Sequence, residues 1–124
     1  MENIYVISEC QNGYQEERVI NFVRSQKARI SNKNFNYHFG KGYLYSRKCG
    51  NVALEDVVRG RTDKIIKKAD EVWVILGGSC CYVTKEEERK VRRKLKLKVR
   101  YFKINQGGRY IGRAHEVKRR ELLV

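Results

Sequence analysis

Val72-Trp73-Val74-Ile75-Leu76, followed directly by Gly77-Gly78, is the stretch that decides the fold. These consecutive apolar residues, most of them β-branched or aromatic, predict a strand buried on both faces. Such strands are typical of a parallel sheet, because the crossover connections between parallel strands place helices on both sides of it. The stretch therefore predicts a central strand of an α/β sheet.

The flanking patterns supply a strand-loop-helix unit on one side and a helix-strand unit on the other. Ile4–Ile7 reads as a strand, Ser8–Gly13 as a polar loop, and Tyr14 to about Lys27 as an amphipathic helix. Thr84 has the capping-box spacing to Glu87, which predicts a helix to about Lys94 that mostly faces water. From 95 to 101 apolar and basic residues alternate, so we predict that a strand at 97–104 lies toward an edge of the sheet.

Two segments are less regular. Residues 31–50 contain two alternating aromatic stretches around Gly40-Lys41-Gly42, which favours a hairpin or an irregular excursion. Residues 54–69 keep helical spacing around Gly60-Arg61-Thr62, which fits one kinked helix or two short ones. The whole order predicts one α/β domain over 1–124, with a largely parallel or mixed sheet flanked by helices and a basic C-terminal tail.

Length, charge and cysteine content limit the class of protein. A chain of 124 residues with a net charge of +14 predicts one domain that attracts nucleic acid, nucleotides or acidic proteins. No apolar run approaches the length of a membrane span, and no basic leader precedes the first strand, so we expect an intracellular protein. The cysteines show no C-x-x-C spacing; a zinc site from Cys10, Cys80, Cys81 and a histidine is conceivable, but free thiols and no metal are expected.

The segment Gly107–Arg113 is the leading candidate for binding an anionic ligand. Its arginines, Arg109 and Arg113, can each form a rigid fork to phosphate oxygens, and its glycines allow the backbone to approach closely. Gly77-Gly78-Ser79 could cradle a phosphate, and the Tyr82 ring could lie over a purine. The competing interpretations are a solvated basic tail, a packing turn and a half-buried core tyrosine. We expect the loops Ser8–Gly13, Gly77–Tyr82 and Asn105–Arg113 to converge beyond the carboxyl ends of the strands.

Catalysis has weaker support. The segment 70–74 is similar to nucleoside deoxyribosyltransferase-like domains, which use a glutamate nucleophile, and the available candidates are Glu9, Glu86 and Glu87. Glu86 and Glu87 also fit as favourable charges at a helix N-terminus. Cys10 could be a reactive thiol, although a packed cysteine is the commoner outcome. Neither histidine has an evident nucleophile beside it, and no phosphate-loop motif is present, so we expect no enzyme and no cofactor.

The early strand Ile4–Ile7, Tyr82 after Gly77-Gly78, and the pair Arg109 and Arg113 together resemble the phage Thoeris anti-defence sponge family, type 1. The resemblance covers the layout of most of the chain, and its specific motif is residues 107–113. It implies a protein that binds the cyclic ADP-ribose isomers made by bacterial TIR-domain proteins. The ligand would be sequestered without cleavage in the cytoplasm of the infected host, in a pocket between paired subunits. Tyr82 would lie against adenine, with Arg109 and Arg113 nearby.

The same resemblance implies an assembly. Some members of the family form hexamers that hold cyclic trinucleotides at a separate arginine-lined site, and this role would fall to Arg24. Arg92 stands where the family has a polar amide, so base recognition is expected to differ. We therefore expect a homo-oligomer, a dimer and possibly a hexamer, which the small apolar content available to one core also favours.

A general nucleic-acid-binding domain is the alternative function. Its support is the basic series Lys94, Lys96, Lys98 and Arg100, together with the aromatics of 35–45, which could combine phosphate contacts with base stacking. A basic edge strand is also an ordinary protection against sheet aggregation. A sponge should bind one class of small nucleotide tightly, whereas a nucleic-acid binder should prefer polymers and depend steeply on salt.

Overall fold

The computed structural model describes residues 2–27, 33–40, 52–76, 83–104 and 114–116. The chain alternates strands and helices along most of this length. In order, the elements are β1 (Glu2–Glu9), α1 (Gly13–Lys27), β2 (Lys33–Gly40), α2 (Val52–Val58), α3 (Asp63–Lys68), β3 (Glu71–Leu76), α4 (Lys85–Leu95), the 3-10 turn η1 (Lys96–Lys98), β4 (Val99–Ile104) and β5 (Ala114–Glu116).

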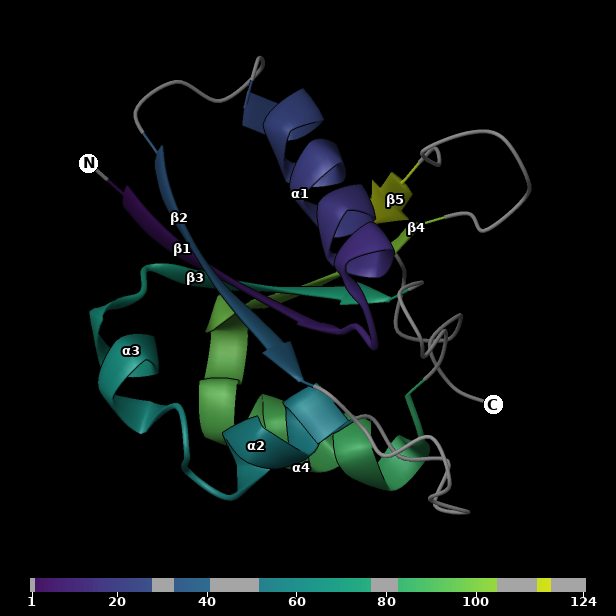
Figure 1. The fold of residues 1–124 in the computed structure, drawn as a ribbon. Helices are drawn as coiled ribbons and strands as arrows, with labels where there is room; N and C mark the ends of the chain where they lie inside the picture. The colour runs from purple at the N-terminus through teal and green to yellow at the C-terminus, as the bar shows by residue number, and fades with distance from the viewer. Residues whose placement is uncertain (1, 28–32, 41–51, 77–82, 105–113, 117–124) are drawn as a thin grey trace.

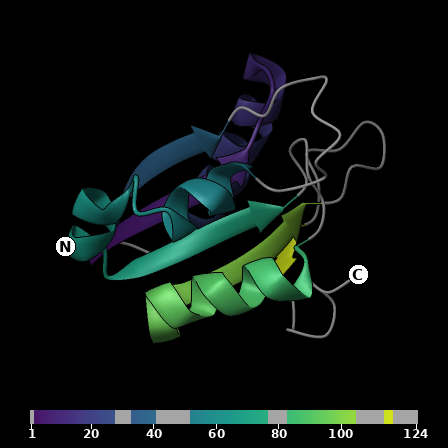
Figure 2. The same ribbon diagram turned by 90° about the horizontal axis from the view of Figure 1, so that it is seen from below.

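The strands form one sheet in the order β2-β1-β3-β4-β5 (Figure 1). Strands β2, β1, β3 and β4 are parallel to their neighbours, and β5 pairs antiparallel with the last residues of β4. Helix α1 covers one face, and α2, α3 and α4 cover the other (Figures 1 and 2). The predicted fold class, a small α/β domain with a largely parallel, mixed sheet, is confirmed.

The core consists of one apolar cluster on each face of the sheet. On the α1 face, Trp73 is 1% exposed and packs against Phe102, with ring centroids 4.8 Å apart. On the other face, residues such as Leu54 of α2 and Val91 of α4 pack against β3. Residues 72–76 of β3 contribute to both clusters, which confirms the prediction that this strand is central and buried on both faces.

The structure confirms the predicted capping box at the start of α4 and decides between the two alternatives for residues 54–69. Thr84 Oγ1 accepts a hydrogen bond from the Glu87 backbone N–H at 3.1 Å, and the Glu87 carboxylate accepts from the Thr84 N–H, so the capping box is present. Residues 54–69 form two short helices and not one kinked helix. The break falls at Gly60, whose φ of +80° is a backbone conformation that L side chains rarely adopt.

Two strand predictions are confirmed only in part. Residues 35–39 form a strand, β2, which pairs in parallel with β1, and residues 41–51, which include the other arm of the expected hairpin, lie outside the described part. Strand β4 lies toward an edge of the sheet, as predicted, because its outer neighbour is the short terminal strand β5, which pairs with Phe102–Ile104. The prediction of one alternating strand from residue 95 was wrong: Leu95 ends α4, residues 96–98 form η1, and Lys96 has a φ of 56°.

These corrections remove the basic strand that motivated the nucleic-acid alternative. Lys94 lies in α4, Lys96 and Lys98 lie in η1, and Arg100 lies in β4. The described aromatics of that alternative, Phe35, Tyr37 and Phe39, are partly buried against the α1-side cluster. They pack, as aromatic clusters usually do.

Candidate functional site

The sheet has a topological switch between β1 and β3. From β1 the chain passes to α1 on one face, whereas from β3 it passes to α4 on the opposite face (Figure 1). In open parallel sheets, ligands bind at such a point, beyond the carboxyl ends of the strands. We call this end of the sheet the carboxyl edge, and the end where the parallel strands begin the amino edge. The carboxyl edge is the candidate site.

The end of β1 is buried at this edge. Ser8 Oγ donates to the Ile75 carbonyl at 2.8 Å, which joins β1 to β3, and the Cys10 thiol donates to Ser8 Oγ at 3.7 Å. Burial is the main reason that the pKa of Cys10 rises to about 11, while the hydrogen bond with Ser8 acts in the opposite direction. The thiol therefore stays protonated at neutral pH, and the interpretation of Cys10 as a packed cysteine is confirmed.

The start of α1 provides an exposed ring beside the switch. Asn12 Oδ1 accepts from the Gln15 N–H at 3.0 Å, and Gln15 Oε1 accepts from the Gln11 N–H at 2.6 Å, so local side chains cap the helix. Tyr14 is 83% exposed. Sequence reasoning used Tyr14 only to mark a helix start. Its position directly after the loop at a strand end makes this exposed ring a candidate surface for a base.

The start of α4 is acidic, and its carboxylates have structural roles. Glu86 pairs with Lys90 at 3.0 Å, and the hydrogen bond from Lys90 is the main cause that lowers the pKa of Glu86. Glu87 completes the capping box. Glu9, the third carboxylate considered for catalysis, is 7% exposed at the end of β1. Both carboxylates of the helix start thus serve as the favourable N-terminal charges expected of them.

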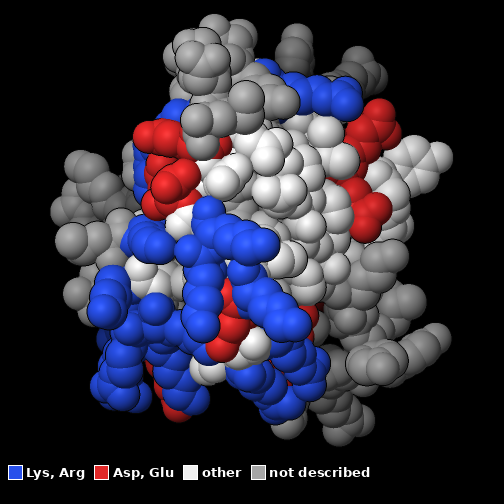
Figure 3. All heavy atoms as spheres, turned by 90° about the vertical axis from the view of Figure 1, so that its left-hand side faces the viewer, with Lys and Arg blue, Asp and Glu red and all other residues white. Residues whose placement is uncertain are grey.

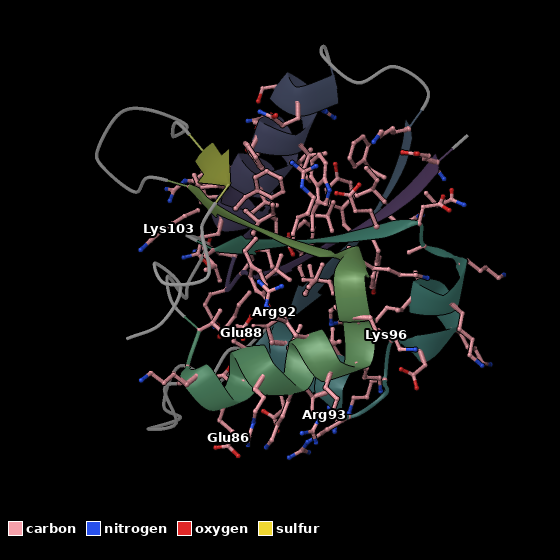
Figure 4. All side chains as sticks on the ribbon, turned by 180° about the vertical axis from the view of Figure 1, so that it is seen from behind. Glu86, Glu88, Arg92, Arg93, Lys96 and Lys103 are labelled. Carbon is pink, nitrogen blue, oxygen red and sulfur yellow. The ribbon has the colours of Figure 1, made fainter. Side chains whose placement is uncertain are left out.

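A buried charge that the sequence did not predict lies between α4 and the sheet. Glu88 is 1% exposed and pairs with Arg92, one helical turn later. Both side chains point toward the sheet, whereas Glu86 and Arg93 point away from it (Figure 4). The Arg92 guanidinium lies 5.5 Å from the centre of the Tyr101 ring, and burial raises the pKa of Tyr101 to about 12. Arg92 therefore neutralises a buried carboxylate and does not face the carboxyl edge as a free base-reading group. Glu88 shares one helix face with Val91 and Leu95, and this spacing in the sequence could have predicted that Glu88 is buried.

The predicted binding residues divide into two groups. Tyr82, Arg109 and Arg113 lie outside the described residues, in the segments that follow the ends of β3 and β4. Arg24 is exposed in the last part of α1 and lowers the pKa of Tyr37, which burial raises by a larger amount. At 1.5 Å per residue along the helix, Arg24 lies about 15 Å from Tyr14 along the axis. Arg24 is thus not part of the carboxyl edge. The separate site expected for Arg24 requires a position away from this edge.

The described ranges offer neither a cluster of metal ligands nor a helix that could span a membrane. No group of three or more His, Cys, Asp or Glu side chains there could hold a metal ion, and Cys80 and Cys81 lie outside those ranges. His38 instead pairs with Asp56 at 2.9 Å. None of the helices that the structure describes is long and apolar enough to cross a membrane.

The chain was compared with protein-family models, curated proteins and solved structures. No family model matches it, and neither does any curated protein or solved structure.

Proposed function

We propose that the protein is a non-catalytic sponge that binds a cyclic ADP-ribose isomer at the carboxyl edge. By sequestering this signal in the cytoplasm of an infected bacterium, it would keep a Thoeris-type defence inactive and so serve a phage. The observation that carries the proposal is the switch between β1 and β3, because the segments holding Tyr82 and Arg109 to Arg113 follow the adjacent strands β3 and β4.

The charge of the carboxyl edge bears on which residues would attract the ligand. The described helix starts here are acidic: Glu16 lies in the first turn of α1, and Glu86, Glu87 and Glu88 lie in the first turn of α4. Part of this negative charge is neutralised, because Glu86 pairs with Lys90 and Glu88 pairs with Arg92, and Lys85 is exposed at the same helix start. Arg109 and Arg113 would supply further positive charge for a pyrophosphate, so the affinity should fall when either is removed.

Three of the four groups considered for catalysis support binding without turnover. Glu87 is committed to the capping box, Glu86 to Lys90, and Cys10 to a buried protonated state. A nucleophile or general base needs a reactive protonation state and access to the substrate. The assembly proposed with this function is a homo-oligomer, at least a dimer, with the ligand between paired subunits.

Calorimetric titration with cyclic ADP-ribose isomers tests the proposal. Arg109→Ala and Arg113→Ala each remove a charge-assisted contact of about 1.5–3 kcal/mol, so affinity should fall roughly tenfold to a hundredfold for each. Tyr82→Ala should cost about 1–3 kcal/mol if the ring stacks on adenine, and Tyr82→Phe should be nearly neutral. Tyr14→Ala measures whether the exposed ring on α1 shares that role.

Arg59→Ala is the matched control, because Arg59 is an exposed arginine whose described ion pair is with Glu55, in its own helix region. It should bind as the parent does. Denaturing the loaded protein should release the ligand intact. Unchanged affinity of the double arginine variant would refute the proposal, and so would catalytic conversion of excess ligand.

A further inference from the structure

A surface at the amino edge gathers lysines and arginines from two parts of the chain that are distant in sequence, α3 on the one hand and α4 with η1 on the other. Figure 3 shows these side chains concentrated over α3 and the end of α4, and Figure 2 shows both elements at the end where the strands begin. We call it the basic surface, and it consists of Lys64, Lys67 and Lys68 of α3 with Arg93, Lys94, Lys96 and Lys98 of α4 and η1.

Two contacts hold the halves of the basic surface together. Lys94 Nζ lies 2.9 Å from Asp63 Oδ1, and Lys98 Nζ donates to the Ala69 carbonyl at 3.1 Å. For the other five members, no ion pair is found with any residue that the structure describes. Lysines and arginines held side by side favour a polyanion, because they neutralise its phosphates and release the counterions condensed on it.

A hollow of about 430 Å³ opens next to this surface, between α3 and the strands β1 and β2. Asn3, Tyr5 and Asn36 line it from the sheet, and Lys64, Ile65 and Lys68 line it from α3. Lys64 and Lys68 thus belong to both the hollow and the basic surface. The volume is within the range of small-ligand sites.

The hollow contains an unused amide and an exposed apolar side chain. Asn3 is held in place, because its Nδ2 donates to the Lys68 carbonyl at 3.4 Å and its Oδ1 accepts from Asn34 at 3.3 Å. Asn36 is exposed, and its amide has no hydrogen-bond partner among the described residues. Ile65 is 46% exposed. A primary amide pairs with both N6 and N7 of adenine, and an apolar side chain can cover the face of a base.

We propose that the basic surface binds single-stranded nucleic acid and that the hollow takes one adenine of that strand. Asn36 pairs with the edge of the base, Ile65 covers its face, and Lys64 and Lys68 hold the adjoining phosphates. The strand is single because a base inside a duplex cannot reach the hollow. The ligand is a polymer because the cations continue past the hollow onto α4 and η1, where Arg93 points away from the sheet (Figure 4). This site is at the opposite edge from the proposed sponge site and does not depend on it.

Fluorescence anisotropy with labelled oligo-dA and oligo-dC of equal length tests the proposal across a series of salt concentrations. The parent should bind oligo-dA roughly fivefold to a hundredfold more tightly than oligo-dC. Asn36→Ala should bind both equally with an unchanged salt slope. Lys64→Gln and Lys68→Gln should each reduce the slope of log affinity against log salt by about 0.7 while keeping the preference for adenine. Lys85→Gln, an exposed lysine at the carboxyl edge, is the matched control and should change neither quantity.

All four substituted side chains are exposed, so circular dichroism should show folded variants. The proposal is overturned if the parent binds no oligonucleotide at low salt, or if duplex DNA binds as tightly as oligo-dA. Retention of the adenine preference by Asn36→Ala would also overturn it. Displacement of oligo-dA by an equal nucleotide concentration of adenosine monophosphate would assign the hollow to a free nucleotide and refute polymer binding.

Discussion

Replacing Gly40 with alanine should destabilise the fold by steric conflict between backbones. A Cβ at Gly40 would lie 2.6 Å from Ala53 N and 2.7 Å from Ala53 Cα, whereas carbon atoms in contact normally sit about 3.5–4.0 Å apart. Relief needs a displacement of about 1 Å between β2 and α2. That movement is resisted because Ala53, Leu54 and Val57 are fully buried in the core.

Overpacking of this kind costs about 1–3 kcal/mol, and the backbone contact favours the upper half of that range. For a chain of this length the melting temperature should fall by roughly 8–12 °C. Because the Gly40 carbonyl accepts from the Cys10 N–H at 3.0 Å, the movement should also disturb the end of β1 at the candidate site. Affinity for the sponge ligand should therefore fall even at temperatures where the variant is folded.

Urea unfolding followed by the fluorescence of Trp73, the sole tryptophan, measures this effect. Gly13→Ala is the matched control, since nothing lies within 4 Å of its added Cβ, and it should be neutral or stabilising by up to about 1 kcal/mol. Gly40→Ala combined with Ala53→Gly should recover little stability, because the closest atoms belong to the backbone. Equal stability of Gly40→Ala and Gly13→Ala would refute the reasoning.

Further predictions concern stability and local chemistry. Thr84→Ala should lower the free energy of unfolding by about 1 kcal/mol through loss of the cap, whereas Thr62→Val, which removes a buried hydroxyl without a partner among the described residues, should be neutral or stabilising in the same urea assay. Cys10 should resist alkylation in peptide mapping of the folded protein. Since its pKa is raised from 9.0 to about 11, its contribution to stability should be complete below pH 9 and lost as pH rises through 11. Amides of β3 should exchange with deuterium more slowly than those of β5, and equal rates would contradict the central position of β3.

The sequence predicted the elements whose local pattern and tertiary environment agree. Residues 72–76 are apolar throughout because both faces of β3 are covered, so length and composition were sufficient. The start of α4 was predictable because a capping box involves only residues three apart. Tyr82, Arg109 and Arg113 stay predictions, since they lie outside the described residues.

The errors arose where a pattern had two physical causes. Strand β2 is at the side of the sheet and only partly buried, so its alternation matches that of a hairpin arm, and its pairing with β1 is a long-range contact. The residues that alternate at 95–101 run from Leu95, the last core residue of α4, through a turn into β4. The alternation does not show where the helix ends and where the strand begins. Glu88 was missed because a carboxylate is rarely placed in a core unless a partner such as Arg92 accompanies it.

The direction of the helices explains why net charge indicated a ligand without locating its site. In a parallel sheet, each helix between adjacent strands starts at the carboxyl edge and ends at the amino edge. The helix dipole favours acidic residues at the start and basic residues at the end. Helix α4 follows this rule, with Glu86, Glu87 and Glu88 in its first turn and Arg92, Arg93 and Lys94 in its last. Helix α3 likewise ends on Lys67 and Lys68. The helices thereby make the carboxyl edge acidic and the amino edge basic, although residues 85–124 hold more than half of all lysines and arginines. At the switch point the acidic side chains oppose the attraction that the helix dipoles have for an anion, so an anion there would depend on arginines such as Arg109 and Arg113 as well. At the amino edge, the lysines and arginines of the helix ends themselves attract a polyanion.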